Sequence, residues 1–230
     1  MTTPTKSGSA PSGPVGSDEL RRRVDEIDWF HSYEIAPGIV SPGEYRPQIH
    51  LDRGCLPEDL TGRSVLDIGA WDGFFSFEAE RRGAARVVAA DSWAWQGRSP
   101  LSPKPGSSEP AFGSKRGFEL VHELRNSKVE TTEAEVYDLD PDVIGTFDVV
   151  LFLGVLYHLP DPLRALHQLR QLCRGTLFLE TIALPEQPGE RPLLEYCPGR
   201  TLNGDLSNFW MPNTAAVHAM LADFGFVVRH

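Results

Sequence analysis

Cysteine is scarce in this sequence of 230 residues, which contains only Cys55, Cys173 and Cys197. An odd number of cysteines at distant positions matches neither a disulfide framework nor a zinc site, whose ligands recur at short spacings. We therefore expect free thiols and a reduced, cytoplasmic protein.

The first part of the sequence lacks an apolar run. Residues 1–16 are rich in Ser, Thr, Pro and Gly, so they match neither a signal peptide nor a membrane span. A segment of this composition buries too little apolar surface to fold. We expect residues 1–17 to be a disordered tail and expect no contact with a membrane.

Positive charge is also in short supply. The chain has 22 basic and 32 acidic residues, which gives a formal net charge of −10. This balance disfavours binding of a nucleic acid backbone over a wide surface and favours a small or cationic substrate. No pair of acids with an amide stands at the expected strand ends, so we expect no catalytic metal.

What the sequence does contain is a strand, a glycine turn and a helix in succession. Val65 and Leu66 continue a short apolar run that ends at Asp67, and Gly69 and Gly73 precede a helical pattern over 74–82. Because glycine has no Cβ, a ligand can approach such a turn closely. The N–H groups at the start of the following helix are available to bind it.

The spacing of the glycines indicates which nucleotide is bound. The pattern is D-x-G-x-x-x-G, whereas a dinucleotide site has G-x-G-x-x-G. The next strand, 86–90, ends at Asp91, which lies 18 residues beyond Gly73. Each piece alone has another explanation, since the turn can serve backbone geometry and an Asp at a strand end is often a helix N-cap.

Together these pieces resemble the class I S-adenosylmethionine-dependent methyltransferases. The resemblance implies that the glycine turn cradles the methionine part of the cofactor and that Asp91 holds the ribose. The cofactor-binding residues that it implies are Asp67, Gly69, Gly73, Asp91, Ser92, Trp93, Glu135, Val136, Tyr137, Leu153 and Tyr157.

The remaining pattern supports this fold class. Further strands are expected at 128–136, 147–153 and 175–181, and a long loop is expected at 93–117. Helices are expected at 118–125, from Pro162 with Asp161 as its N-cap, and at 214–224. Alternation of this kind predicts an α/β fold with a doubly wound, mostly parallel sheet. We expect a helix and cap segment at 18–60, in which the aromatic residues 29–35 are extended. A methyltransferase domain is expected at 61–230, in which the last strand of the family fold is missing.

A second resemblance is more specific. Residues 44–53 and 154–158 are similar to the tRNA wobble-uridine carboxymethyltransferase and related bacterial methyltransferases, and the likeness runs with gaps from Trp29 to Phe226. In that family, lysines are expected where this chain has His31 and His50, and a tryptophan is expected at Tyr45. The arginine expected to bind an extra carboxylate on the cofactor is missing, because Leu206 and Ser207 stand there. We therefore expect ordinary S-adenosylmethionine as the donor.

Methyl transfer is an in-line displacement, and a neutral acceptor also needs a base. The candidate bases are His31, His50 and His158, although the first two could be packed histidines of the cap and the third could fix its loop. Tyr45 and Trp210 are candidates for substrate binding or for the core. Trp93, Trp95, Phe112 and Phe209 could line an acceptor pocket or pack a loop.

The predicted function is methylation of a small molecule at O or N, with a secondary metabolite as one candidate acceptor. The alternatives are a tRNA-modifying enzyme and a binding module without catalysis.

Overall fold

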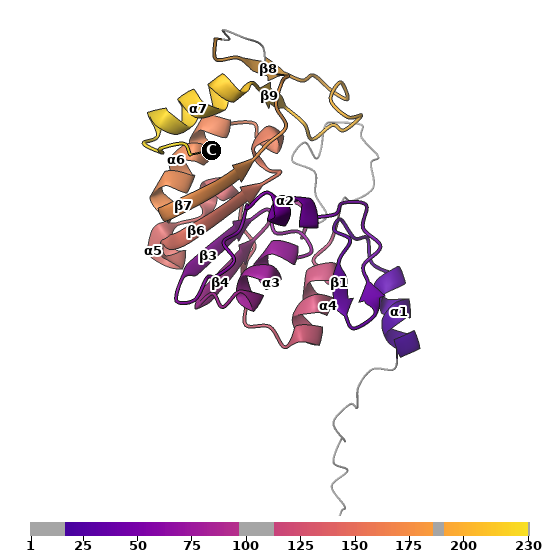
Figure 1. Ribbon diagram of the computed structural model, residues 1–230. Coiled ribbons are helices and arrows are strands. Elements are labelled where there is room, and N and C mark those ends of the chain that lie inside the picture. Colours follow the sequence, from indigo (N-terminus) through magenta and orange to yellow (C-terminus); the bar gives the residue numbers. More distant parts are fainter. Residues whose placement is uncertain (1–16, 97–112, 186–190, 230) are drawn as a thin grey trace, which may run out of the picture.

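The computed structural model describes residues 17–96, 113–185 and 191–229. Its centre is a parallel sheet with the strand order β5-β4-β3-β6-β7 (Figure 1). The strands are β3 (Ser64–Ile68), β4 (Arg86–Ala90), β5 (Glu130–Thr132), β6 (Phe147–Leu153) and β7 (Cys173–Glu180). The order reverses beside β3, so the carboxyl ends of β3 and β6 mark the place where such sheets bind ligands.

Alternate residues of the strands enter two separate cores. Val65, Val87 and Val149 pack on one face of the sheet with the helices α3 (Phe74–Arg81) and α4 (Arg116–Arg125). Leu66 and Val150 pack on the other face with α6 (Pro162–Leu172) and α7 (Thr214–Asp223). Figure 1 shows these helix pairs on opposite sides of the sheet. The doubly wound, parallel fold predicted from the sequence is confirmed.

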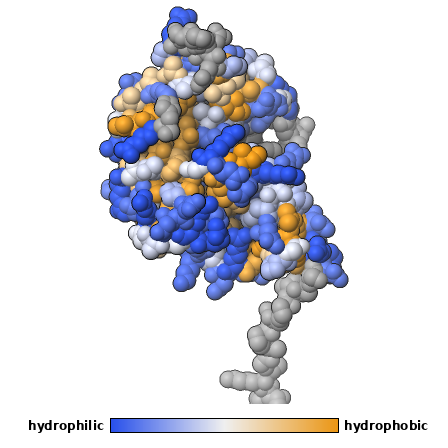
Figure 2. All heavy atoms as spheres, in the orientation of Figure 1, coloured by the Kyte–Doolittle hydropathy of each residue, from blue (hydrophilic) through white to orange (hydrophobic). Residues whose placement is uncertain are grey.

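The cap precedes the sheet. It contains α1 (Ser17–Asp25), a hairpin of β1 (Glu34–Ala36) and β2 (Ile39–Val40), and the short helix α2 (Gln48–Asp52). The smaller elements that follow are η1 (Val136–Asp138), α5 (Pro141–Ile144), η2 (Leu156–His158), β8 (Leu194–Tyr196) and β9 (Trp210–Pro212). In the view of Figure 2, apolar residues gather over the region of α7 and β7, and hydrophilic ones cover the lower middle of the face.

Local signals placed several boundaries correctly. The Asp161 carboxylate accepts a hydrogen bond from Arg164 N at 3.0 Å, and Pro162 begins α6, as the sequence predicted. β6 has the predicted bounds. The predicted tail 1–17, apart from its last residue, and much of the loop after Trp93 lie outside the described residues.

Two predicted strands are shorter than expected. The third strand was expected over 128–136, but β5 covers only Glu130–Thr132. Thr132 pairs with Ala90, the last residue of β4, so no partner continues beyond it. The aromatic segment 29–35 was expected to be extended, but only its last two residues belong to β1. The residues before them are held by side chains of the glycine turn.

Candidate active site

Two glycines shape the turn after β3. Gly69 and Gly73 have φ values of +80° and +83°, which favour glycine. A Cβ on Gly69 would lie 2.5 Å from Val155 Cγ2, and one on Gly73 would lie 2.5 Å from Phe77 Cε2. Gly69 N also donates to Ala90 O at 2.8 Å, which ties the turn to the end of β4. Packing within the protein therefore requires these glycines, in addition to any approach by a ligand.

Asp91 lies at the end of β4, beside this turn. Its carboxylate accepts hydrogen bonds from Trp71 N at 3.0 Å and Ala94 N at 3.1 Å, and the residue is 8% exposed. Burial raises the pKa of Asp91 to about 6, against the opposing effect of the backbone hydrogen bonds. A carboxylate has about four acceptor positions, and the backbone N–H groups of Trp71, Ser92, Ala94 and Trp95 all act on that of Asp91. Asp91 thus lies at the end of β4 beside the glycine turn, where the sequence predicted the ribose contact, and its ribose role stays a prediction.

Asp67 supports the turn from within the protein. It is buried at the end of β3 and accepts a hydrogen bond from Ser76 Oγ in α3 at 2.6 Å. Burial raises the pKa of Asp67 to about 6, although the Ser76 hydrogen bond lowers it in part. Its observed contact therefore joins the strand to the helix on either side of the turn.

A histidine of the cap is bound to the glycine turn. Asp72, which directly precedes Gly73, accepts hydrogen bonds from Phe30 N at 3.1 Å and His31 N at 2.8 Å through Oδ2. Its Oδ1 contacts His31 Nδ1. His31 and Asp72 are 5% and 1% exposed. Tyr33 Oη adds a hydrogen bond to the Asp72 carbonyl at 3.0 Å. Sequence reasoning missed Asp72, because its partner lies 41 residues away.

Four rings stack in a row from the turn to α2. Trp71 stacks on Phe30, Phe30 on Tyr45, and Tyr45 on His50, with centroid distances of 4.7, 5.2 and 5.5 Å. Burial lowers the pKa of His50, while the nearby Glu180 carboxylate raises it in part. The stack brings the predicted residues Tyr45 and His50 to the glycine turn. Packing within this stack is also sufficient to explain why these two positions carry aromatic rings.

The end of β6 contributes a tyrosine. A Cβ on Gly154, which follows Leu153, would lie 3.7 Å from both Tyr157 Oη and Glu180 Oε2. Burial raises the pKa of Tyr157 to about 12, with Glu180 and Asp205 adding to the effect. Tyr157 is therefore a hydrogen-bond donor at neutral pH. Glu180, at the end of β7, is a second residue that sequence reasoning missed, although an acid at a strand end was a usable signal.

His158 makes contacts that hold its loop to the segment before β9. Its Nδ1 lies 3.1 Å from Ser207 O and 3.0 Å from Ser207 Oγ, and that hydroxyl contacts Asp205 at 2.8 Å. Burial lowers the pKa of His158. These contacts join η2 to the segment before β9 and favour the loop-fixing role. They also show that Ser207, at the position of the family's arginine, is engaged within the protein.

The predicted cofactor-binding residues Ser92, Trp93, Glu135, Val136 and Tyr137 follow β4 and β5. Trp93 Nε1 lies 3.4 Å from Glu135 Oε1, so these two meet beside half-buried Ser92. Val136 is buried in the core, and Tyr137 Oη accepts a hydrogen bond from Asp161 N at 3.1 Å.

Two candidate pocket tryptophans have protein partners. Trp210 Nε1 lies 3.4 Å from Pro160 O, and its ring meets Tyr196 edge-on. Trp95 is buried and donates to Trp71 O at 2.6 Å. Phe112 lies outside the described residues, and Phe209 is half-buried.

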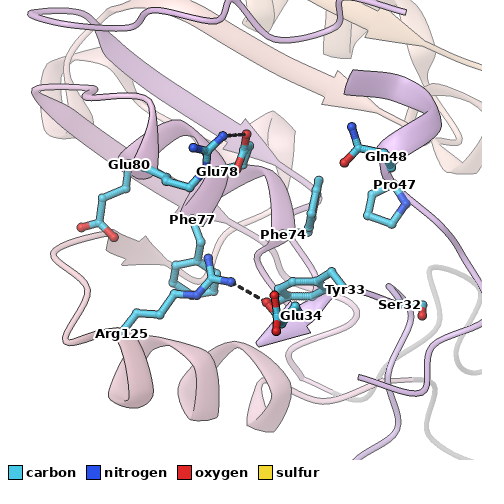
Figure 3. A pocket seen from close by; sticks show the side chains of 11 residues that line it. Ser32, Tyr33, Glu34, Pro47, Gln48, Phe74, Phe77, Glu78, Glu80 and Arg125 are labelled. Carbon is cyan, nitrogen blue, oxygen red and sulfur yellow. Dashed lines mark hydrogen bonds and ion pairs between the residues drawn. The ribbon is translucent and has the colours of Figure 1, made fainter. Parts of the chain in front are cut away.

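A groove of about 560 Å³ lies elsewhere, among β1, α2, α3 and α4 (Figure 3). Its charged groups are already paired: Arg81 binds Glu78 at 2.7 Å, and Arg125 donates to Glu34 O at 2.9 Å. None of the predicted site residues lines it. The groove is lined by Ser32, Tyr33, Glu34, Pro47, Gln48, Phe74, Phe77, Glu78, Glu80, Arg81 and Arg125.

Within residues 17–96, 113–185 and 191–229, no group of three or more His, Cys, Asp or Glu side chains is arranged to bind a metal ion. In the same part of the chain, no helix has the length and apolar character needed to cross a membrane.

Comparison with known proteins gives the family. Residues 43–230 match a family model described as a methyltransferase domain. The tRNA U34 carboxymethyltransferase of Trichlorobacter lovleyi is 28% identical over 224 residues, which cover 93% of this chain and 61% of that protein. The enzyme of the same name from Cronobacter sakazakii is 29% identical over 233 residues, covering 96% and 64%. The chain thus spans less than two thirds of the length of these relatives.

Solved structures share the fold. The N-terminal domain of EvdMO1, crystallised in the presence of SAH and D-fucose, has a TM-score of 0.63 and 22% identity, covering 93% of this chain and 88% of that one. The [4+2]-cyclase SpnF has a TM-score of 0.55 and 14% identity, covering 93% and 70%. With the glycine turn, the two buried aspartates and the family match together, this chain belongs to the class I S-adenosylmethionine-dependent methyltransferases.

Proposed function

We propose that the protein transfers the methyl group of S-adenosylmethionine to an oxygen or nitrogen atom of a small molecule. Asp91 would hold the ribose of the donor, and the turn from Gly69 to Gly73 would hold its methionine part. The bound cofactor supplies a methyl group on a positively charged sulfur. The protein must hold the acceptor in line with that methyl group and take its proton.

The observation that carries this proposal is the pair of buried histidines next to the cofactor turn. Both histidines contact Tyr45: His31 meets its ring edge-on at a centroid distance of 5.8 Å, and His50 stacks on it at 5.5 Å. Burial lowers the pKa of His50, which favours a neutral imidazole at pH 7. A neutral histidine is suited to accept a proton, whereas a lysine at these positions would bind an anion. We therefore assign the role of base to this pair, with Tyr45 beside the acceptor.

The second candidate is modification of a tRNA wobble uridine. The names of the matched relatives favour it. The formal net charge of −10 opposes it, because tRNA binding relies on basic residues that contact phosphates. The segment at Leu206 and Ser207 also offers no cation for a carboxylated donor. The small-molecule acceptor accounts better for these features, and the sugar in the EvdMO1 crystals is consistent with it.

Incubation of the full chain with methyl-labelled S-adenosylmethionine tests the proposal. The acceptor panel should contain phenols, glycosides, amines and bulk tRNA. We expect label in a small acceptor and none in tRNA, and Asp91→Ala should abolish the transfer. Label in tRNA would support the second candidate, while stabilisation by S-adenosylhomocysteine without any turnover would indicate a binding module.

Calorimetry with the two donors provides an independent check. We expect S-adenosylmethionine to bind more tightly than its carboxylated form, because the described residues offer no arginine at the expected position. Tighter binding of the carboxylated donor would overturn this part of the proposal. A gel shift with bulk tRNA at low salt then shows whether the chain binds nucleic acid at all.

A further inference from the structure

Asp72 connects the cofactor turn to a candidate base, and the inference drawn from it rests on the proposed function. Its Oδ2 accepts two backbone N–H groups, from Phe30 and His31, and its Oδ1 faces His31 Nδ1. The position of this carboxylate is therefore fixed by the backbone of the cap as well as by the turn. A buried carboxylate with both oxygens engaged in this way has a single orientation toward the imidazole.

The contact with Asp72 selects one tautomer of His31. An ionised carboxylate only accepts hydrogen bonds, so the ring nitrogen that faces it carries a proton. In the neutral ring, Nδ1 is then the donor and Nε2 holds the lone pair. No described residue hydrogen-bonds Nε2, and Nε2 is not among the fully buried polar atoms without a partner. This nitrogen is therefore not fully buried and has no hydrogen-bond partner among the described residues.

The surrounding rings restrict the orientation of the imidazole. Phe30, Tyr45, Phe74 and Phe75 surround His31, with centroid distances of 4.8, 5.8, 5.9 and 5.8 Å. A ring confined on several sides and bonded at Nδ1 presents Nε2 in one direction. Such preorganisation is what a proton acceptor needs at the moment of transfer.

We infer that Asp72 is a positioning residue, which keeps His31 in the Nδ1–H tautomer so that Nε2 takes the proton of a hydroxyl acceptor. As the acceptor oxygen forms its bond to the methyl carbon, the carbon–sulfur bond breaks and its electron pair remains on sulfur. The hydroxyl proton moves to Nε2. The products are a methyl ether, S-adenosylhomocysteine and an imidazolium whose charge faces the Asp72 carboxylate.

Asp72→Asn separates this role from a purely structural one. The amide oxygen can still accept the N–H groups of Phe30 and His31, while the amide nitrogen donates to Nδ1. The substitution therefore preserves the attachment of the cap and reverses the tautomer, which places the proton on Nε2. We expect kcat with the hydroxyl acceptor to fall by about 10²–10⁴-fold and the affinity for S-adenosylhomocysteine to stay unchanged.

Nitrogen-15 NMR of the full chain with S-adenosylhomocysteine reads the tautomer directly. We expect a protonated Nδ1 and an unprotonated Nε2 for His31, and the reverse in Asp72→Asn. This measurement on the wild-type protein needs no variant and no acceptor. A protonated Nε2 in the neutral wild-type ring would overturn the inference even if the protein proves to be a methyltransferase.

Kinetic controls complete the test. His31→Gln should lose as much activity as Asp72→Asn, and the double variant should lose no more, because the two residues act as a unit. Asp223→Asn, an exposed change on α7, should retain full activity.

Retention of more than a tenth of kcat in Asp72→Asn would refute the positioning role. Failure of every small acceptor would refute the proposed function and the proton transfer, while the NMR result would still decide whether Asp72 sets the tautomer.

Discussion

Lowering the pH from 7.5 to 5 is expected to weaken the binding of S-adenosylhomocysteine about ten-fold through Asp91 alone. Burial raises the pKa of Asp91 to about 6 in the free protein. One pH unit below that value, about one carboxyl group in eleven is ionised, which corresponds to about 1.4 kcal/mol of lost binding. A protonated carboxyl group offers the ribose hydroxyls a poorer acceptor, so binding selects the ionised form.

The raised pKa of Asp91 weakens ligand binding at low pH, but it has the opposite effect on the stability of the free protein. The pKa of Asp91 is raised from 3.8 in the unfolded chain to about 6 in the folded protein. The contribution of Asp91 to the free energy of unfolding is therefore most favourable below pH 3.8 and is lost as the pH rises through about 6. Acidification from pH 7.5 to 5 therefore does not unfold the protein through this group. Asp67, whose pKa burial also raises to about 6, acts in the same direction.

Calorimetric titration at both pH values measures the effect. Asp91→Asn should bind weakly at pH 7.5, because a charged hydrogen bond contributes about 1.5–3 kcal/mol, and its affinity should change little at pH 5. Asp223→Asn is the matched control and should follow the wild-type profile. Equal wild-type affinities at the two pH values, or a variant profile parallel to that of the wild type, would refute the assignment of Asp91 to the ribose.

Two further predictions concern stability. Gly69→Ala should lower the free energy of unfolding by about 2–4 kcal/mol, because about 1 kcal/mol of strain at positive φ adds to a clash with Val155 of about 1–3 kcal/mol. Gly62 has φ +75° and nothing within 4 Å of an added Cβ, so Gly62→Ala should cost only the backbone strain. Equal losses of unfolding free energy for the two variants in urea denaturation would contradict the predicted clash. His50→Phe keeps the ring stack but removes a group whose pKa burial lowers in the folded state. The wild type should lose stability as the pH falls below about 6.5, the variant should lose less, and denaturation at pH 7.5 and 5.5 compares them.

Much of the sheet followed from local signals in the sequence. β6 is buried on both faces over most of its length, which matches the apolar run over 149–153 that marks a central parallel strand. The turn at Gly69 and Gly73 is recognisable because positive φ leaves few residue types other than glycine. β5 was overestimated because its length depends on where β4 ends, which is a property of the neighbouring strand.

The site was less predictable because its main contacts join distant parts of the chain. His31 was a candidate on the basis of resemblance, but nothing in its surroundings in the sequence points to Asp72. Glu180 influences Tyr157 and His50 only because three separate segments meet at one edge of the sheet. Periodicity and spacing predict elements and turns, whereas the pairing of side chains between elements requires coordinates.

Four hydrogen bonds or ion contacts join residues 30–33 to Asp72. Replacing the aromatic segment without the nucleotide turn, or the turn without the segment, would therefore break these contacts. A chimaera that imports the segment alone would leave a buried acid facing a foreign surface. Attempts to graft a new acceptor preference onto this scaffold should keep both halves of the contact and vary the residues around it.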